Sequence, residues 1–528
     1  MALSEITLRA TNSSNSTNSG RGPRQTTLFD SLGAAQRRHK RTHKVSLDQE
    51  NVPIENGSDG IAVKTAKRRR ASPLEHKPTE TLQLNMPKRP QNIYVKRPFA
   101  IHSSHIAQRI RQRQTLAASS VCTISRLASL VSPASSAFRL YADSEQQLGV
   151  LPLACKYSSM SMPGKLAMVD ESGHISIFDT HKLDPDSEDS LEPVQRWKAH
   201  ENSVFDIEWR NDSIQAVTAS ADETCRLWDV ERQMCLGSFV GHSQTVRSVS
   251  WRPDDMSCFT TASRDGSIMM WDTRCNKISV DGEQVFRSVN IIERAHCGLL
   301  SSKRPVRGKR GITSGSVTCI RHLQHNPLLV ASVGSTSEIV KFWDVRMRQQ
   351  ARKLLPTPVT LSSLASSSKR SRGTASLSLD SDGARLFSAC NDNSVYVHNA
   401  LLLSQPIARL AAPEFECQSF NVGTAASPCS RYLAAGSSNG NVVVWELDSL
   451  SANSSGRYAV LQGHNKEAGC IAWYPGKDRI QLATCGDDGV LRIWNEDSVL
   501  AEAAKTDPMR RCVWGFSHIT HSVAKKNY

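Results

Sequence analysis

The stretch Ser263-Arg264-Asp265-Gly266-Ser267-Ile268-Met269-Met270-Trp271-Asp272 decides the fold of this 528-residue chain. A polar turn at Asp265 and Gly266 leads into an apolar run, typical of a buried strand, that ends in Trp-Asp. Related endings recur along the chain, at Phe178-Asp179, Trp228-Asp229, Trp343-Asp344, His398-Asn399, Trp445-Glu446 and Trp494-Asn495. The seven endings therefore predict seven copies of one structural unit.

The spacing of the endings identifies that unit. Successive endings are 50, 43, 72, 55, 47 and 49 residues apart, and one four-stranded WD-repeat blade takes roughly 40–45 residues. An Asp stands six positions before the aromatic at Asp222, Asp265 and Asp488. These features predict an all-β fold, a seven-bladed WD-repeat β-propeller over residues 135–528, with a basic insertion at about 297–313 in the longest spacing.

Polar residues recur at fixed places in the repeats. His200, His242 and His464 follow Ala or Gly where a Gly-His pair opens a blade. There His, the turn Asp, a strand Ser or Thr and the Trp can form a hydrogen-bonded chain that satisfies buried polar groups. His242, Asp265 and Ser263 resemble a hydrolase triad, but the combination recurs once per blade, as a structural device does. We therefore predict no catalytic residue, metal or cofactor, and no enzyme.

Positive charge is concentrated at the beginning of the chain. Residues 1–150 hold 23 Lys and Arg against 10 Asp and Glu, which accounts for +13 of the overall net charge of +15. Residues 1–134 are rich in polar residues and poor in aromatics, so they cannot bury enough surface to offset chain entropy. We predict that residues 1–134 form a mostly disordered basic extension that makes weak contact with nucleic acid.

A compact basic run in this extension predicts nuclear import and a location in the nucleus. The run comprises Lys67, Arg68, Arg69 and Arg70. A solvated charge run is the alternative interpretation. Ser72, followed by Pro73, is a candidate for phosphorylation by a proline-directed kinase, which would partly neutralise the run.

A second motif lies near the N-terminus. Gln25 and Leu28 fit the motif by which proteins dock on the replication sliding clamp, and Phe29 supplies an aromatic two positions too early. Ser31 and Leu32 occupy the positions that take aromatics, so the match is incomplete. The candidate clamp-binding residues are Gln25, Leu28, Phe29 and Leu32; the alternative is an ordinary polar segment.

The cysteines and the absence of apolar targeting segments indicate the cellular environment, and two short segments are candidates to close the ring. The fourteen cysteines form no Cys-x-x-Cys pair, and no secretory signal or membrane-spanning run is present, so we expect a reduced, intracellular protein without a membrane partner. A closed propeller leaves no long exposed edge. Two segments compete to supply the closing strand, Phe138–Tyr141 and Cys512–His518.

Two repeats end in Trp-Asp-x-Arg, at Trp271-Asp272-Thr273-Arg274 and Trp343-Asp344-Val345-Arg346. Arg residues after consecutive Trp-Asp endings would project near each other on one face, as planar donors for carboxylates or carbonyls of a partner. The alternative is a surface Arg that pairs with a nearby carboxylate.

Longer stretches resemble one family. The run Lys198-Ala199-His200-Glu201-Asn202-Ser203-Val204-Phe205-Asp206, followed by Trp209, resembles the second blade of the denticleless family, and residues 263–277 resemble its third blade. The resemblance covers roughly residues 145–497. The basic extension before the propeller, with almost nothing after it, looks more like a fungal member than an animal one.

The resemblance implies a function. Members of that family are substrate receptors of the cullin-four RING ubiquitin ligase and dock on its damaged-DNA-binding adaptor. They bring proteins bound to the DNA-loaded sliding clamp, such as the replication-licensing factor, to polyubiquitination, which limits re-replication in the cell cycle and after DNA damage. The implied adaptor-binding residues are Asp272, Arg274, Asp344 and Arg346. A chromatin- or histone-binding WD-repeat scaffold is the rival interpretation, and it would need an acidic pocket for a basic peptide.

Overall fold

The structure is a computed structural model, and every residue that it describes belongs to one compact unit, Ala100–Tyr528. The described residues are 124–141, 149–158, 164–182, 191–275, 277–280, 282–296, 315–347, 356–362, 372–403, 406–448, 456–476 and 478–521. The predicted basic insertion at about 297–313 lies outside them.

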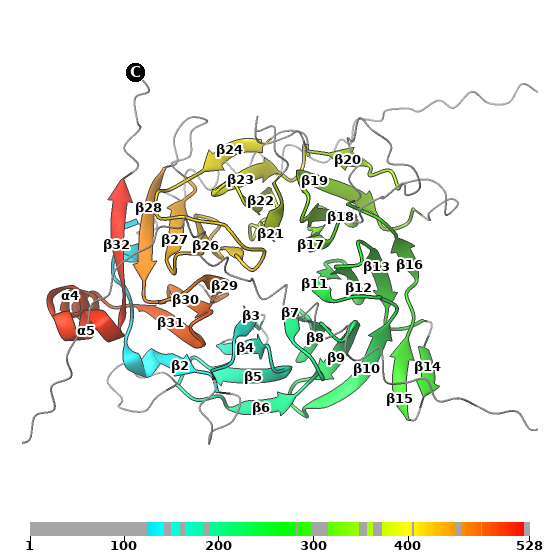
Figure 1. Ribbon diagram of the computed structural model, residues 1–528, viewed down its shortest axis with the longest axis horizontal. Coiled ribbons are helices and arrows are strands. Elements are labelled where there is room, and N and C mark those ends of the chain that lie inside the picture. The colour runs from blue at the N-terminus through cyan, green and yellow to red at the C-terminus, as the bar shows by residue number, and fades with distance from the viewer. Residues whose placement is uncertain are drawn as a thin grey trace, which may run out of the picture. The chain divides into compact units, whose positions relative to one another are not determined.

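Short strands surround a common centre in this unit (Figure 1). Within the described ranges they form six hydrogen-bonded sheets, four of which have four antiparallel strands each. The first of these contains β3 (Pro152–Tyr157), β4 (Lys165–Asp170), β5 (His174–Asp179) and β6 (Gln195–Lys198). The second contains β11 (Val246–Arg252), β12 (Asp255–Ser263), β13 (Ile268–Asp272) and β16 (Asn290–Ile292). The other two contain β17 (Val317–Leu323), β18 (Asn326–Gly334), β19 (Ser337–Asp344) and β20 (Thr360–Leu361), and β21 (Thr374–Leu379), β22 (Arg385–Cys390), β23 (Ser394–Asn399) and β24 (Pro406–Leu410).

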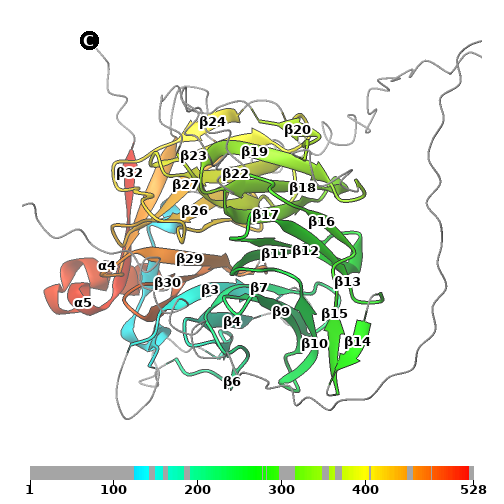
Figure 2. The same cartoon turned by 45° about the vertical axis from the view of Figure 1, so that its right-hand side comes forward.

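An inserted hairpin enlarges the fifth sheet to six strands. Its antiparallel core contains β7 (Val204–Trp209), β8 (Gln215–Ser220), β9 (Thr224–Asp229) and β10 (Met234–Val240). The hairpin is β14 (Lys277–Val280) and β15 (Glu283–Phe286), and β15 runs parallel to β10 along the outside of the ring (Figure 2). The hairpin therefore accounts for part of the long spacing between Trp271 and Trp343.

The ten-stranded sheet closes the ring, and it uses both segments that the sequence offered. It contains β25 (Thr424–Ala426), β26 (Tyr432–Gly436), β27 (Val442–Glu446), β28 (Arg457–Gln462), β29 (Ala468–Trp473), β30 (Gln481–Gly486), β31 (Val490–Glu496), β32 (Gly515–His521), β1 (Leu130–Ser132) and β2 (Ala137–Arg139). Both β1 and β2 pair with β31, whereas β32 lies between β28 and β1. The segment Phe138–Tyr141 thus contributes to β2 beside β31, and the C-terminal segment, as β32, joins β28 to β1, a strand that lies outside both predicted segments.

Strand β1 lies inside the segment 1–134 that the sequence analysis assigns to the extension. Burial explains the difference, because Leu127, Leu130 and Val131 are at most 1% exposed. Leu127 ends α3 (Ile124–Leu127), and η1 (Ala134–Ser136) connects β1 to β2. The apolar spacing in this short stretch is too brief to show a period in the sequence.

Two helices connect β31 to β32, α4 (Ser498–Thr506) and α5 (Pro508–Val513). Asp497 caps α4 by accepting hydrogen bonds from the backbone N–H groups of Val499 and Leu500. Asp507 ends α4 and caps α5, whose first residue is Pro508. The small buried face of α4 packs on β1 and β32, where Ala501 and Ala504 contact Val131 and Phe516.

Apolar side chains fill the spaces between neighbouring sheets. In β27, which reads VVVWE, every residue is buried, so the strand is an apolar run rather than an alternation. Between the sheets of β9 and β12, Phe239 packs on Phe259 and Trp271, with ring centroids 4.7 and 5.6 Å apart. Truncating a buried Trp to Ala typically destabilises a protein by about 3–5 kcal/mol. The predicted all-β WD-repeat propeller is confirmed, whereas its count of seven blades stays a prediction.

Candidate protein-interaction surface

The recurring His residues are structural. His242 contacts Asp265 through Nδ1 (3.0 Å) and Thr261 through Nε2 (2.7 Å), and the Trp271 indole donates to the same Thr261 hydroxyl (2.8 Å). The same chain is formed by His200, Asp222, Thr218 and Trp228, and by His464, Asp488, Thr484 and Trp494. Burial lowers the pKa of His200, so its ring is held neutral as a link in the chain.

The structure corrects one member of this chain and adds another. Thr261 fills the place expected for Ser263, whose hydroxyl instead donates to the Gln244 carbonyl. A histidine that the sequence analysis did not single out, His296, contacts Ser332 (2.8 Å), which also accepts from Trp343 (2.7 Å). The Ala295-His296 pair was the available signal.

The first Trp-Asp-x-Arg turn follows β13. Asp272 accepts three hydrogen bonds from Arg274, from its backbone N–H (2.9 Å), Nε (2.9 Å) and Nη2 (2.8 Å). These bonds lower the pKa of Asp272, which keeps the carboxylate charged. Nη2 also reaches Asp255 at the start of β12 (2.9 Å), although the Arg274 side chain is 58% exposed. The guanidinium is therefore held in one orientation at the surface.

The second turn follows β19 and has the same geometry with one carboxylate fewer. Asp344 accepts from the Arg346 backbone N–H (2.9 Å), Nε (3.0 Å) and Nη2 (2.6 Å). The Arg346 side chain is 66% exposed. β18 begins with Asn326 where β12 begins with Asp255. Arg274 thus has two carboxylate partners among the described residues, and Arg346 has one.

A side-chain amide connects the two sheets that carry these turns. Asn290, on the outer strand β16, donates from Nδ2 to the backbone carbonyls of Val345 (2.9 Å) and Met347 (3.2 Å). These carbonyls flank Arg346 in the sequence. The second turn is therefore tied to the sheet of the first, and the structure brings all four predicted adaptor-binding residues to neighbouring turns.

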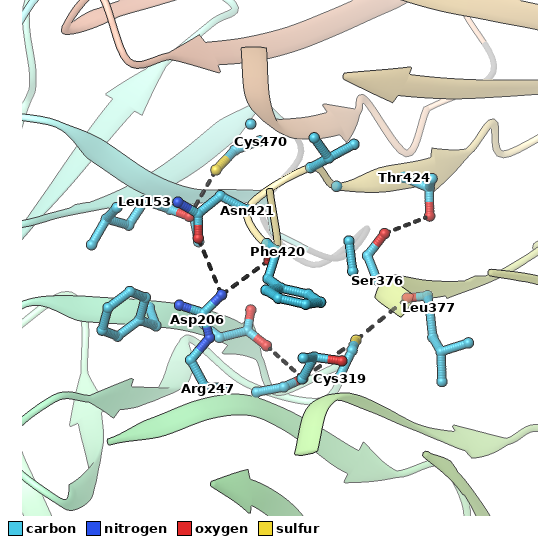
Figure 3. Close-up of a pocket in the computed structure, with 18 of the residues that line it drawn as sticks. Leu153, Asp206, Arg247, Cys319, Ser376, Leu377, Phe420, Asn421, Thr424 and Cys470 are labelled. Carbon is cyan, nitrogen blue, oxygen red and sulfur yellow. Dashed lines mark hydrogen bonds between the residues drawn. The ribbon is translucent and has the colours of Figure 1, made fainter. Parts of the chain in front are cut away.

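A cavity of about 100 Å³ lies among the innermost strands (Figure 3). Arg247 on β11 donates to the Phe420 carbonyl (3.0 Å) and the Asn421 side-chain oxygen (3.1 Å), and its guanidinium lies over the Phe205 ring, 4.5 Å from the centroid. Figure 3 shows the guanidinium reaching toward the segment before β25. Burial lowers the pKa of Arg247 to about 10. This contact links residues 173 positions apart and braces one side of the ring against another.

The charged side chains in this cavity are mainly cationic. Lys156, Arg247 and Arg321 line it together with one carboxylate, Asp206. Asp206 accepts hydrogen bonds from the Ser248 hydroxyl and a backbone N–H, and lies 3.8 Å from Arg321. This lining lacks the acidic character that a pocket for a basic peptide needs.

Glu208 lies two residues after Asp206 on β7, and one of its carboxyl oxygens has no hydrogen-bonding partner among the described residues. Oε2 of Glu208 is buried and has no hydrogen bond in the described part of the chain. Burial raises the pKa of Glu208 to about 7 from its ordinary 4.5, and the charge of Arg321 only partly opposes this. The sequence analysis did not single out Glu208, because it belongs to no motif and its burial depends on how neighbouring strands pack, which the sequence pattern does not give.

The remaining predicted sites lie outside the described residues: Gln25, Leu28, Phe29, Leu32, Lys67, Arg68, Arg69, Arg70 and Ser72. Within the part of the chain that the structure describes, no group of three or more His, Cys, Asp or Glu residues could hold a metal ion. A search of the same residues finds no helix long and apolar enough to cross a membrane.

Comparison with known proteins places the chain. The WD domain, G-beta repeat model matches residues 191–229, 233–272, 414–446 and 456–495. The chain is 35% identical over 352 residues to the denticleless protein homolog of Danio rerio, which covers 65% of this chain and 52% of that protein. The chain belongs to the denticleless family.

Other relatives in the family agree. The human denticleless protein homolog is 31% identical over 382 residues, covering 70% of this chain and 50% of its own length. Protein lethal(2)denticleless of Drosophila melanogaster is 32% identical over 361 residues, covering 65% of this chain and 45% of its own length. The chain thus spans about half the length of the curated relatives it matches, and the predicted family membership is confirmed.

Proposed function

We propose that this chain is the substrate-recognition subunit of a cullin-four RING E3 ubiquitin ligase, with no catalytic role of its own. Membership of the denticleless family supports a WD-repeat substrate receptor. In the proposal the ligase forms the ubiquitin linkage, and the propeller supplies proximity and the choice of substrate by converting a bimolecular encounter into one within a complex.

One observation carries the adaptor assignment. Arg274 and Arg346 stand on exposed turns of neighbouring sheets, each held by the Asp two residues before it. A surface Arg that only paired locally would explain one turn, but two equivalent turns tied together by Asn290 form a single preorganised surface. We assign Asp272, Arg274, Asp344 and Arg346 to the damaged-DNA-binding adaptor.

The finer parts of the proposal concern substrates, location and blade count. The substrates are proteins bound to the DNA-loaded sliding clamp, such as the replication-licensing factor, and their destruction limits re-replication. The protein acts in the nucleus, where its basic extension makes weak contact with nucleic acid. The proposed count of seven blades is supported by the ten-stranded sheet, which contains two antiparallel four-stranded units, β25–β28 and β29–β31 with β1, joined through β32.

The test measures adaptor affinity with purified full-length protein. Arg274→Ala with Arg346→Ala should abolish binding, because truncating a central interface Arg commonly costs about 2 kcal/mol or more. Arg232→Ala is the matched control, since Arg232 is 76% exposed and lies 3.6 Å from Asp229 at the corresponding end of β9. The control should bind like the wild type.

Thermal unfolding separates a lost contact from a lost fold. Exposed side chains contribute little to stability, so the double variant should melt within a few degrees of the wild type. A folded double variant that still binds the adaptor at wild-type affinity contradicts the assignment. A chromatin scaffold would instead bind histone tails, which the cationic cavity does not favour.

A further inference from the structure

The arginines of the two Trp-Asp-x-Arg turns differ from ordinary exposed arginines, because most of the N–H groups on one edge of each guanidinium already make hydrogen bonds within the protein. Arg274 uses Nε and Nη2 on Asp272, and Arg346 uses Nε and Nη2 on Asp344. This edge is one of the two forks through which a guanidinium binds a carboxylate with two parallel hydrogen bonds. The other fork, Nη1 with Nη2, is also blocked in Arg274, because Nη2 donates to both Asp272 and Asp255. In Arg346, Nη2 donates to Asp344 alone, so that second fork stays open. Within the described residues, only Nη1 of each side chain makes no hydrogen bond.

Charge around the first turn also disfavours an acidic partner group. At the first turn Arg274 and Arg252 face three carboxylates, Asp272, Asp255 and Asp254, through ion pairs of 2.7–3.6 Å. At the second turn Arg346 faces Asp344. The first cluster therefore carries a net charge of −1 and the second a net charge of zero.

We infer that Arg274 contacts a neutral acceptor of the partner, namely a backbone carbonyl oxygen, through Nη1. An incoming carboxylate would find Nε and both hydrogens of Nη2 of Arg274 in use, and it would approach Asp255 and Asp272 as a like charge. A carbonyl needs only one N–H and carries no charge to repel. This inference rests on the proposed function and specifies the partner chemistry at the same surface.

The first arm of the test is the salt dependence of adaptor binding. Asp272→Asn combined with Arg274→Gln replaces an ion pair by two amides and leaves the net charge unchanged. The ratio of variant to wild-type Kd is measured at about 50 and at about 500 mM potassium chloride. With a carbonyl acceptor, this ratio should change by less than about threefold between the two salt concentrations, since only charged contacts are strongly screened. A ratio that falls by more than about threefold over that range overturns the inference.

The second arm uses Asp255→Asn, which removes a carboxylate that competes for Arg274. With a carbonyl acceptor, adaptor binding is unchanged or weaker, because Arg274 loses part of its orientation. Tighter binding shows that the partner presents a carboxylate and overturns the inference. The proposed function is tested separately. If the Arg274→Ala, Arg346→Ala variant binds the adaptor as tightly as the wild type, the adaptor contact itself is disproved, whatever the salt dependence of binding.

Discussion

Replacing Glu208 by Gln should make the stability of the propeller less sensitive to a rise in pH from about 5 to about 8. The Glu208 carboxyl is partly buried on β7, and its Oε2 has no hydrogen-bonding partner in the described residues. Burial raises its pKa to about 7. The folded state therefore holds the proton more tightly than the unfolded chain, whose carboxyl has its ordinary pKa of 4.5.

The sign and size of the effect follow from this difference. Because the folded pKa is the higher one, the contribution of Glu208 to stability is fully present below pH 4.5, falls as pH rises toward 7, and is lost above pH 7. The separation between 4.5 and about 7 corresponds to roughly 3 kcal/mol. About 2–3 kcal/mol of this loss falls between pH 5 and pH 8. Gln mimics the protonated acid, so Glu208→Gln should gain that amount relative to the wild type.

Urea unfolding of wild type and Glu208→Gln at several pH values between 5 and 8 measures this difference. The two free energies of unfolding should be similar near pH 5 and diverge steadily as pH rises. Glu201→Gln, at an exposed position before the same strand, controls for removal of one negative charge. Parallel pH profiles for wild type and Glu208→Gln would refute the reasoning, because they would show that the ionised carboxylate is stabilised as well as the neutral acid.

Two further predictions concern the basic extension. Nuclear accumulation of the tagged protein should fall when Ala replaces Lys67, Arg68, Arg69 and Arg70, because the densest positive run is lost; unchanged nuclear fluorescence would show that another run suffices. A peptide of residues 21–36 should bind the sliding clamp weakly, at roughly −8 kcal/mol or poorer, since the usual aromatic pair is missing. Leu28→Ala and Phe29→Ala should each weaken that binding and Thr26→Ala should not, and calorimetric titration without heat above dilution would reject the motif.

The repeat pattern predicted the strands well because a buried third strand must end at the same point in every repeat. The internal hydrogen-bond chain was harder to read. Its hydroxyl lies ten residues before the Trp at Thr218, Thr261 and Thr484, a spacing set by the β-hairpin register rather than by the turn. Ser263 is closer to the turn Asp in sequence, but it faces the Gln244 carbonyl.

An insertion hid a fourth, partial copy of this hydrogen-bond chain, in which His296, Ser332 and Trp343 are linked but Nδ1 of His296 has no hydrogen-bonding partner among the described residues. His242 precedes Trp271 by 29 residues, whereas 47 residues separate His296 from Trp343. Spacing arguments therefore fail where a loop intervenes, although the contact of His296 with Ser332 is the same. Asp255 was missed for a related reason: it lies 19 residues before Arg274, next to a register shift between β11 and β12 that no sequence period predicts.

The surface that carries Arg274 and Arg346 depends on hydrogen bonds between neighbouring sheets, at both the inner and the outer ends of these sheets. At the inner end, Ser248 on β11 contacts Asp206 (3.1 Å) and Arg321 (3.2 Å), which come from the sheets on either side. At the outer end, Asn290 ties β16 to the turn after β19. Because both ends are fixed, a variant in the inner network can change the separation of Arg274 and Arg346 without touching a partner. Loss of adaptor binding therefore assigns a contact only when the variant keeps the melting temperature of the wild type, which makes the exposed turn variants more decisive than any change in the core.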